Sequence, residues 1–153
     1  MSQKSISPDV RDRLGVYKKI EDVPERYRFS QYEDAYAGRN VWSEFVSHKT
    51  ETYDSKSYLE RVTRAGKSWK VFMQIQQRHH ALATPEQIEM WTTEVLSDCK
   101  TRTAYEHYWV YVEHFYDWLV NHTDHPHIYN PVHMAAADES NCASRTIWRR
   151  KTQ

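Results

Sequence analysis

The chain has 153 residues and a mass of 18.4 kDa, which favours a single domain and excludes a large multidomain catalyst. Basic and acidic residues number 21 each, so the absence of net charge identifies no partner class. Leu, Ile, Val and Phe are scarce, whereas Trp, Tyr and Phe make up 14% of the chain. Because aromatic rings bury large areas, we expect a small folded core built mainly on aromatic side chains.

The sequence carries no sign of an extracellular or membrane protein. Cys99 and Cys142 are too few for a disulfide scaffold, and their spacing fits no zinc-ligand pattern. No apolar run approaches the roughly 18 residues that span a bilayer, and the N-terminus lacks a signal peptide. We expect a cytoplasmic protein that contacts no membrane and holds no cofactor or metal.

The N-terminal part of the chain gives weak structural signals. Residues 1–39 are mixed in charge and predict an arm with at most a short helix near Val10 to Ile20. Residues 40–138 form the predicted helical domain, and residues 139–153 form a basic tail or linker. Apolar residues between 30 and 53 are spaced for one or two short helices.

The first long helix is predicted over residues 56–76, where apolar residues recur at helical intervals and Gly66 is a candidate bend. Residues 78–83 then form a connection. A second helix begins clearly, because Thr84 is a good N-cap, Pro85 suits the first helical position and Gln87 completes a capping box.

The strongest element is a helix of about five turns with a continuous aromatic stripe. The stripe is typical of a core rather than of a surface that stacks bases, and it consists of Tyr105, Tyr108, Trp109, Val112, Phe115, Tyr116 and Leu119. We expect Glu106, Glu113 and Asp117 to face solvent. Asn130-Pro131 starts a short helix that ends near Ala137. The predicted fold is all-α, a compact bundle of about four helices with an N-terminal extension.

Two basic segments flank an acidic middle. Residues 56–80 contain six basic side chains against Glu60 alone, residues 140–153 contain four and no acid, and residues 81–139 contain ten acids. On the first long helix a row of cations, spaced three apart, predicts one edge that follows a phosphate backbone: Arg61, Arg64, Lys67 and Lys70. The alternative is a solvated helix face.

Three further groups are candidate phosphate contacts. Lys100, Thr101, Arg102 and Thr103 precede the aromatic helix, where free backbone N–H groups favour an anion. Arg78, His79 and His80 suit a turn that faces phosphate, and Arg149 and Arg150 belong to the basic tail. 

Histidines near the end of the aromatic helix raise a metal hypothesis. His122, His125 and His127 lie close in sequence, but their spacing matches no zinc motif. We therefore predict solvated or capping loop histidines and no metal site. The sequence also lacks a glycine-rich phosphate loop and a nucleophile elbow, so no catalytic residue is predicted.

Residues 40–138 resemble the N-terminal core-binding domain of tyrosine recombinases, the SAM-like domain of phage-type integrases. The likeness lies in Thr101-x-Thr103-x-Tyr105, then Phe115-Tyr116-x-Trp118-Leu119, then Asn130-Pro131. The runs 78–85 and 123–131 look like those of integrase-type proteins from haloarchaea and their mobile elements. The resemblance implies a helical clamp on duplex DNA that serves DNA integration, with contacts from the basic helix and from residues 100–103.

Family members cut DNA with a C-terminal domain that contains a His-x-x-Arg motif. None of the nine histidines here has Arg three residues later, so we expect a non-catalytic DNA-binding protein whose second partner is a catalytic recombinase domain or subunit. One alternative is a protein-interaction module that uses exposed Trp42 and Trp148. The other is a small regulator that binds operator DNA, although no helix-turn-helix pair stands out.

Overall fold

The computed structural model describes residues 8–51 and 55–153, and every regular element in them is helical. Short 3-10 turns come first: η1 (Val10–Arg13), η2 (Ile20–Asp22), η3 (Glu25–Tyr27) and η4 (Phe29–Tyr32). The helices that follow are α1 (Glu33–Tyr36), α2 (Val41–Thr50), α3 (Lys56–Ile75), α4 (Pro85–Asp98) and α5 (Thr101–Ala104). The chain continues through a π-helical segment, η5 (Tyr105–Trp109), to α6 (Val110–Asn121), α7 (Pro131–Ala137) and α8 (Cys142–Lys151). The all-α prediction is confirmed.

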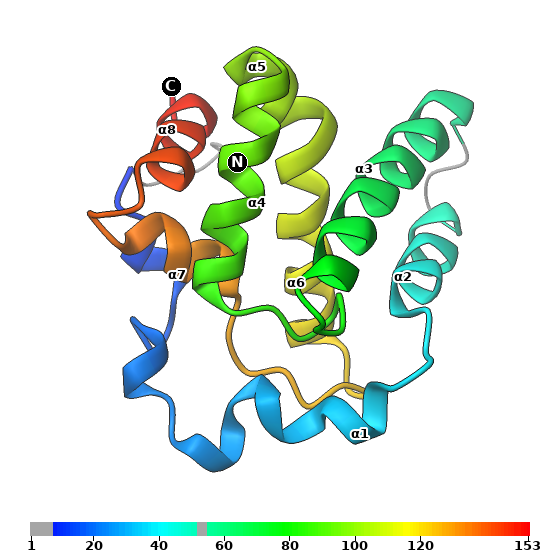
Figure 1. Cartoon of the computed structure of the whole chain (residues 1–153), viewed down its shortest axis with the longest axis vertical. Helices are drawn as coiled ribbons and strands as arrows, with labels where there is room; N and C mark the ends of the chain where they lie inside the picture. The colour runs from blue at the N-terminus through cyan, green and yellow to red at the C-terminus, as the bar shows by residue number, and fades with distance from the viewer. Residues whose placement is uncertain (1–7, 52–54) are drawn as a thin grey trace, which may run out of the picture.

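The bundle is arranged around one long helix formed by α5, η5 and α6 (Figure 1). Helices α3 and α4 lie in front of it, and α2 packs on the outer side of α3. On the other flank α7 and α8 pack against α4, while the N-terminal segment crosses the base of the bundle (Figure 1).

Local capping explains where the main helices begin. The Ser55 hydroxyl accepts a hydrogen bond from the backbone N–H of Tyr58 at the start of α3. Thr84 and Gln87 form the predicted reciprocal capping box at the start of α4. The Asn130 side chain accepts from the N–H of Val132 at the start of α7. These predicted boundaries are confirmed.

Gly66 lies inside α3, an uninterrupted helix of twenty residues. A Cβ atom at this position would collide with the indole of Trp42, which packs directly on the glycine. The same indole donates a hydrogen bond to the backbone oxygen of Val62, at 3.2 Å. Gly66 therefore lets α2 approach α3 closely, and it does not interrupt the helix.

The predicted aromatic core is confirmed, and its polar atoms bind the turn between α3 and α4. Tyr116 is fully buried, and its hydroxyl donates to the backbone oxygen of His80 and accepts from the N–H of Ala83. The indole N–H of Trp69 donates to the same His80 oxygen. Buried aromatic side chains thus hold this turn in place.

Residues 8–39 form part of the core, where the sequence predicts an arm; the first seven residues of that prediction lie outside the described range. Phe29 is 1% exposed and stacks on Tyr129 with ring centroids 4.0 Å apart. The Tyr129 hydroxyl also accepts from the Phe29 backbone N–H. The segment contains few aliphatic residues, so its pattern predicts an arm. Its aromatic rings nevertheless bury enough surface to attach it to the core.

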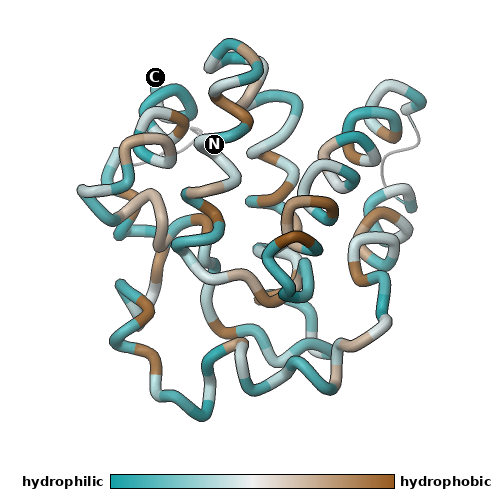
Figure 2. The backbone as a smooth tube through the Cα atoms, viewed as in Figure 1, coloured by the Kyte–Doolittle hydropathy of each residue, from teal (hydrophilic) through white to brown (hydrophobic). Residues whose placement is uncertain are grey.

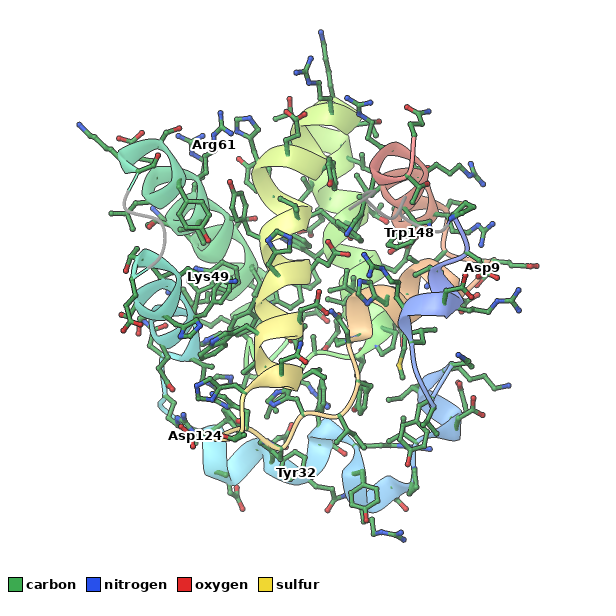
Figure 3. All side chains as sticks on the ribbon, turned by 180° about the vertical axis from the view of Figure 1, so that it is seen from behind. Asp9, Tyr32, Lys49, Arg61, Asp124 and Trp148 are labelled. Carbon is green, nitrogen blue, oxygen red and sulfur yellow. The ribbon has the colours of Figure 1, made fainter. Side chains whose placement is uncertain are left out.

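The predicted basic tail is largely a packed helix, α8. Ile147 and Trp148 are buried, and the Trp148 indole donates to the backbone oxygen of Pro8 (Figure 3 shows it beside Asp9). At the other end of α8 the Glu89 carboxylate of α4 accepts from the N–H groups of Ala143 and Ser144. Both ends of the described chain therefore join the bundle.

Replacing Gly66 with Ala should destabilise the protein by roughly 1–3 kcal/mol, because the new methyl group displaces Trp42. The gain in helix propensity, about 1 kcal/mol, acts in the opposite direction. Urea unfolding measures the change. In a Trp42→Leu background the penalty should shrink, and an equal penalty in both backgrounds would contradict the proposed collision.

Stability should fall as the pH drops below about 6.5. Burial lowers the pKa of His80 to about 3 and that of His127 to about 4. As the pH falls through about 6.5, these histidines bind protons in the unfolded chain but not in the folded one. The folded state therefore has its full stability above that pH and loses stability below it. Between pH 7.5 and 5.5 we expect a loss of roughly 2–3 kcal/mol in urea unfolding.

His80→Gln retains an acceptor for the N–H of Trp42 but removes the titration, so this variant should lose part of the pH dependence, the rest remaining with His127 and the other histidines whose pKa burial lowers. His127→Gln is the matched second variant. If both variants kept the wild-type pH dependence, the assignment to these histidines would be wrong.

Candidate nucleic-acid interface

The predicted row of cations on α3 reaches solvent. Arg61, Arg64 and Lys67 are exposed and Lys70 is half-buried. A step of three residues falls about 60° short of a helical turn, so the row crosses the outer face of α3 diagonally instead of following one edge. Arg64 lines a hollow on the α4 side, and Lys70 lines another on the α2 side.

The hollow between α2 and α3 has a volume of about 490 Å³. Lys67 and Lys70 supply its charge, Ser47 and Thr63 contribute hydroxyl groups, and no acidic side chain is among the described residues that line it. Trp42, Val46 and Val71 form its apolar part. Cations beside hydroxyl donors suit a phosphate group.

The hollow between α3 and α4, about 480 Å³, has walls of opposite charge. Arg64 and Lys67 lie on its α3 side, while Glu94 and Asp98 lie on its α4 side. Carboxylates repel phosphate, so this hollow is a poorer anion site than the one beside α2.

The structure uses the turn of residues 78–80 for packing. The Arg78 guanidinium donates to the backbone oxygen of Leu82 at 2.6 Å. His79 bonds the backbone of Arg39 and Ala81 through its two ring nitrogens, and the Nε2 atom of His80 accepts from the N–H of Trp42. Burial lowers the pKa of both histidines. They therefore carry no charge at neutral pH and are poor phosphate ligands.

The cluster at the start of α5 lies at the far end of the bundle from that turn (Figure 1). Lys100 and Arg102 are exposed, whereas Thr101 and Thr103 are half-buried. The Arg102 guanidinium lies 3.3 Å from the Glu106 carboxylate one turn later. This ion pair offsets part of the predicted anion attraction and leaves Lys100 as the stronger cation.

Arg149 and Arg150 lie on a different surface from the α3 cations. In Figure 3, Arg61 of α3 and Trp148 of α8 stand on opposite sides of the long central helix. Arg149 is exposed and Arg150 is half-buried. The structure therefore does not bring the two basic segments together on one face.

The ion pair of Lys151 with Glu113 corrects two predictions: that Glu113 faces solvent, and that the C-terminal cations belong to a basic tail or linker. Glu113 is 1% exposed rather than facing solvent, and the Lys151 ammonium lies 2.6 Å from both of its carboxylate oxygens. His133 donates from Nε2 to the same carboxylate at 2.7 Å. Burial alone raises the pKa of Glu113, but the bonds and charges of His133 and Lys151 outweigh it and lower that pKa. This buried triad attaches α8 to α6 and α7.

The loop histidines also differ from their predicted solvated role. His125 and His127 are buried; His125 bonds the Tyr36 hydroxyl at 2.5 Å, and His127 donates to the backbone oxygen of Ala81. Across the described residues, no group of three His, Cys, Asp or Glu side chains is arranged so that it could hold a metal ion. Trp42 and Trp148 are 3% and 5% exposed, so the predicted exposed aromatic anchors are wrong.

Three exposed residues of α3 escaped the sequence analysis: Val71, Gln74 and Ile75. A signal was present, because Val71 and Ile75 fall out of phase with the apolar stripe that includes Trp69, Phe72 and Met73. Val71 and Ile75 therefore place apolar side chains next to the cations on the outer face of α3.

Comparisons of the chain with protein-family models, curated proteins and solved structures give no match. Among the described helices, none is both long enough and apolar enough to cross a membrane.

Removing the Lys151 charge should destabilise the protein strongly. Lys151→Met leaves the buried Glu113 carboxylate with only His133, and breaking a buried ion pair in this way costs roughly 3–5 kcal/mol. Urea unfolding measures the loss, and Glu113→Gln in the same chain should recover part of it. The control Arg149→Met removes an exposed charge and should change stability by less than about 0.5 kcal/mol; equal losses would contradict the buried triad.

Proposed function

We propose that the chain binds duplex DNA through the outer face of α3. The observation that carries this proposal is that Arg61, Arg64 and Lys67 are exposed and form no ion pair with any described residue. Cations that have no ion-pair partner in the described part of the chain remain available to neutralise phosphates and release counterions. Lys70 extends the row into the hollow beside α2, and Lys100 adds a cation at the end of the bundle.

The resemblance to recombinase core-binding domains supports a role in DNA integration and site-specific recombination. The chain would hold DNA, and a catalytic recombinase domain or subunit would supply the cleavage. The backbone-bonded His79 and His80 fall outside this proposed surface, and Arg149 and Arg150 would act as a separate contact. With zero net charge, binding depends on the local field of α3 and should be sensitive to salt.

A second candidate function is docking of a protein partner on α3. It is favoured by Val71 and Ile75, which are 50% and 75% exposed on that helix. A protein partner would be retained in the absence of DNA and would not require Arg61.

The DNA proposal is tested by fluorescence anisotropy with a random-sequence duplex across a salt series. Arg61→Ala/Arg64→Ala should weaken binding and lower the slope of log K against log salt by about 2, since each phosphate contact contributes roughly 0.9. The matched control Arg13→Ala/Lys19→Ala removes two exposed charges from the N-terminal segment and should leave the slope unchanged. Equal effects of both pairs would indicate a non-local charge effect and overturn the α3 assignment.

A further inference from the structure

Beyond its cations, the outer face of α3 carries a stripe of mixed chemistry. Lys67, Val71, Gln74 and Ile75 follow one another at i, i+4, i+7 and i+8, and all four are exposed. Val71 is 50% and Ile75 75% exposed, and hydrophobic colour is concentrated in the C-terminal half of α3 (Figure 2). The stripe thus changes from cationic to apolar and amide-bearing along the helix.

The surroundings make α3 a ridge. One hollow separates it from α2 and a second separates it from α4, so its outer face stands between two depressions. A helix with its side chains is roughly 10–12 Å across, and the major groove of B-DNA is about 12 Å wide. A ridge of this size fits the major groove, with the phosphates of the flanking strands lying over the hollows.

The exposed side chains match one kind of base pair. In the major groove, only thymine presents a methyl group, and adenine presents an acceptor and a donor that an amide side chain can bind together. Val71 and Ile75 offer apolar contact, and the exposed Gln74 lies beside Val71 on the α2 side of the helix. Guanine, in contrast, is usually read by Arg or Lys.

We propose that the C-terminal half of α3 enters the major groove at A·T pairs. Val71 and Ile75 contact thymine methyl groups, Gln74 binds adenine, and Lys67 with Lys70 binds the phosphates of the strand beside α2. This inference rests on the proposed DNA binding and adds to it a preference for A·T-containing sites.

The acidic wall of the hollow between α3 and α4 determines how α3 is positioned in the groove. Glu94 and Asp98 face Arg64 across that hollow and repel the second strand. The duplex therefore lies closer to α2 than to α4, and Ile75, which also lines the acid-walled hollow, marks the α4 edge of the contact. Glu94→Gln/Asp98→Asn should raise affinity for every duplex alike, since these residues touch no base.

The test compares three duplexes of equal length at one salt concentration: an A·T-rich duplex, the same duplex with deoxyuridine for thymidine, and a G·C-rich duplex. Deoxyuridine keeps the base pairing and removes only the methyl group. The A·T-rich duplex should bind best, with about fourfold loss for each contacted methyl that is removed. Replacing adenine by 7-deazaadenine, which lacks the N7 acceptor, should also weaken binding.

Variants assign the effect to the stripe. Val71→Ala/Ile75→Ala should bind the thymidine and deoxyuridine duplexes equally, and Gln74→Ala should no longer distinguish 7-deazaadenine from adenine. Leu59→Ala is the matched control, because Leu59 is also an exposed apolar residue of α3, and it should retain both discriminations.

The outcomes separate this inference from the proposed function. Salt-sensitive binding that is lost in Arg61→Ala/Arg64→Ala but is equal for thymidine and deoxyuridine would overturn the A·T inference and leave the DNA proposal intact. Absence of binding to every duplex at low salt would overturn both and would favour a protein partner for Val71 and Ile75.

Discussion

The arrangement of the helices depends on the Tyr116 hydroxyl, which lies at the centre of the core and holds the turn between α3 and α4. It donates to the His80 oxygen at 2.8 Å and accepts from the Ala83 N–H at 3.0 Å, while Trp69 donates to the same oxygen. An unsatisfied polar atom at this depth is costly, so the turn and the two aromatic side chains must be buried together. The turn determines where α3 ends and α4 begins. The exposure of the outer face of α3, and with it the proposed DNA surface, therefore follows from hydrogen bonds inside the core.

The need to satisfy buried polar atoms also explains why His79 and His80, which follow Arg78, do not form a phosphate site. His79 and His80 satisfy backbone groups of neighbouring segments, and burial keeps their rings neutral. In a linear sequence, Arg78-His79-His80 is equally compatible with a solvent-facing turn. The two possibilities differ only in which backbone groups lie near the rings, and that depends on residues as distant as Arg39 and Trp42.

Local features of the fold could be predicted from the sequence, and long-range pairings could not. The capping box at Thr84 and the aromatic stripe depend on neighbours within a few residues, and both were predicted correctly. Phe29 meets Tyr129 across 100 residues of chain and Glu113 meets Lys151 across 38, so neither pair leaves a periodic signal. Because these long-range pairings leave no local signal, the sequence predicts residues 1–39 as an arm and residues 139–153 as a tail. The cations of α3 were identified from the sequence, but their diagonal course and the acids facing them were not.

The zero net charge of the chain conceals local surfaces of opposite charge that lie next to each other. The cations of α3 confront Glu94 and Asp98 of α4 on one side, while on the other the described lining residues are lysines, hydroxyl and apolar side chains and the amide of Gln74. Such a surface attracts phosphate along a narrow strip and repels it a helix diameter away, which limits how many phosphates α3 can neutralise. With few phosphate contacts, a useful affinity for DNA requires a contribution from the bases. Val71, Gln74 and Ile75 are placed on the same face of α3 as these cations, where they can supply it.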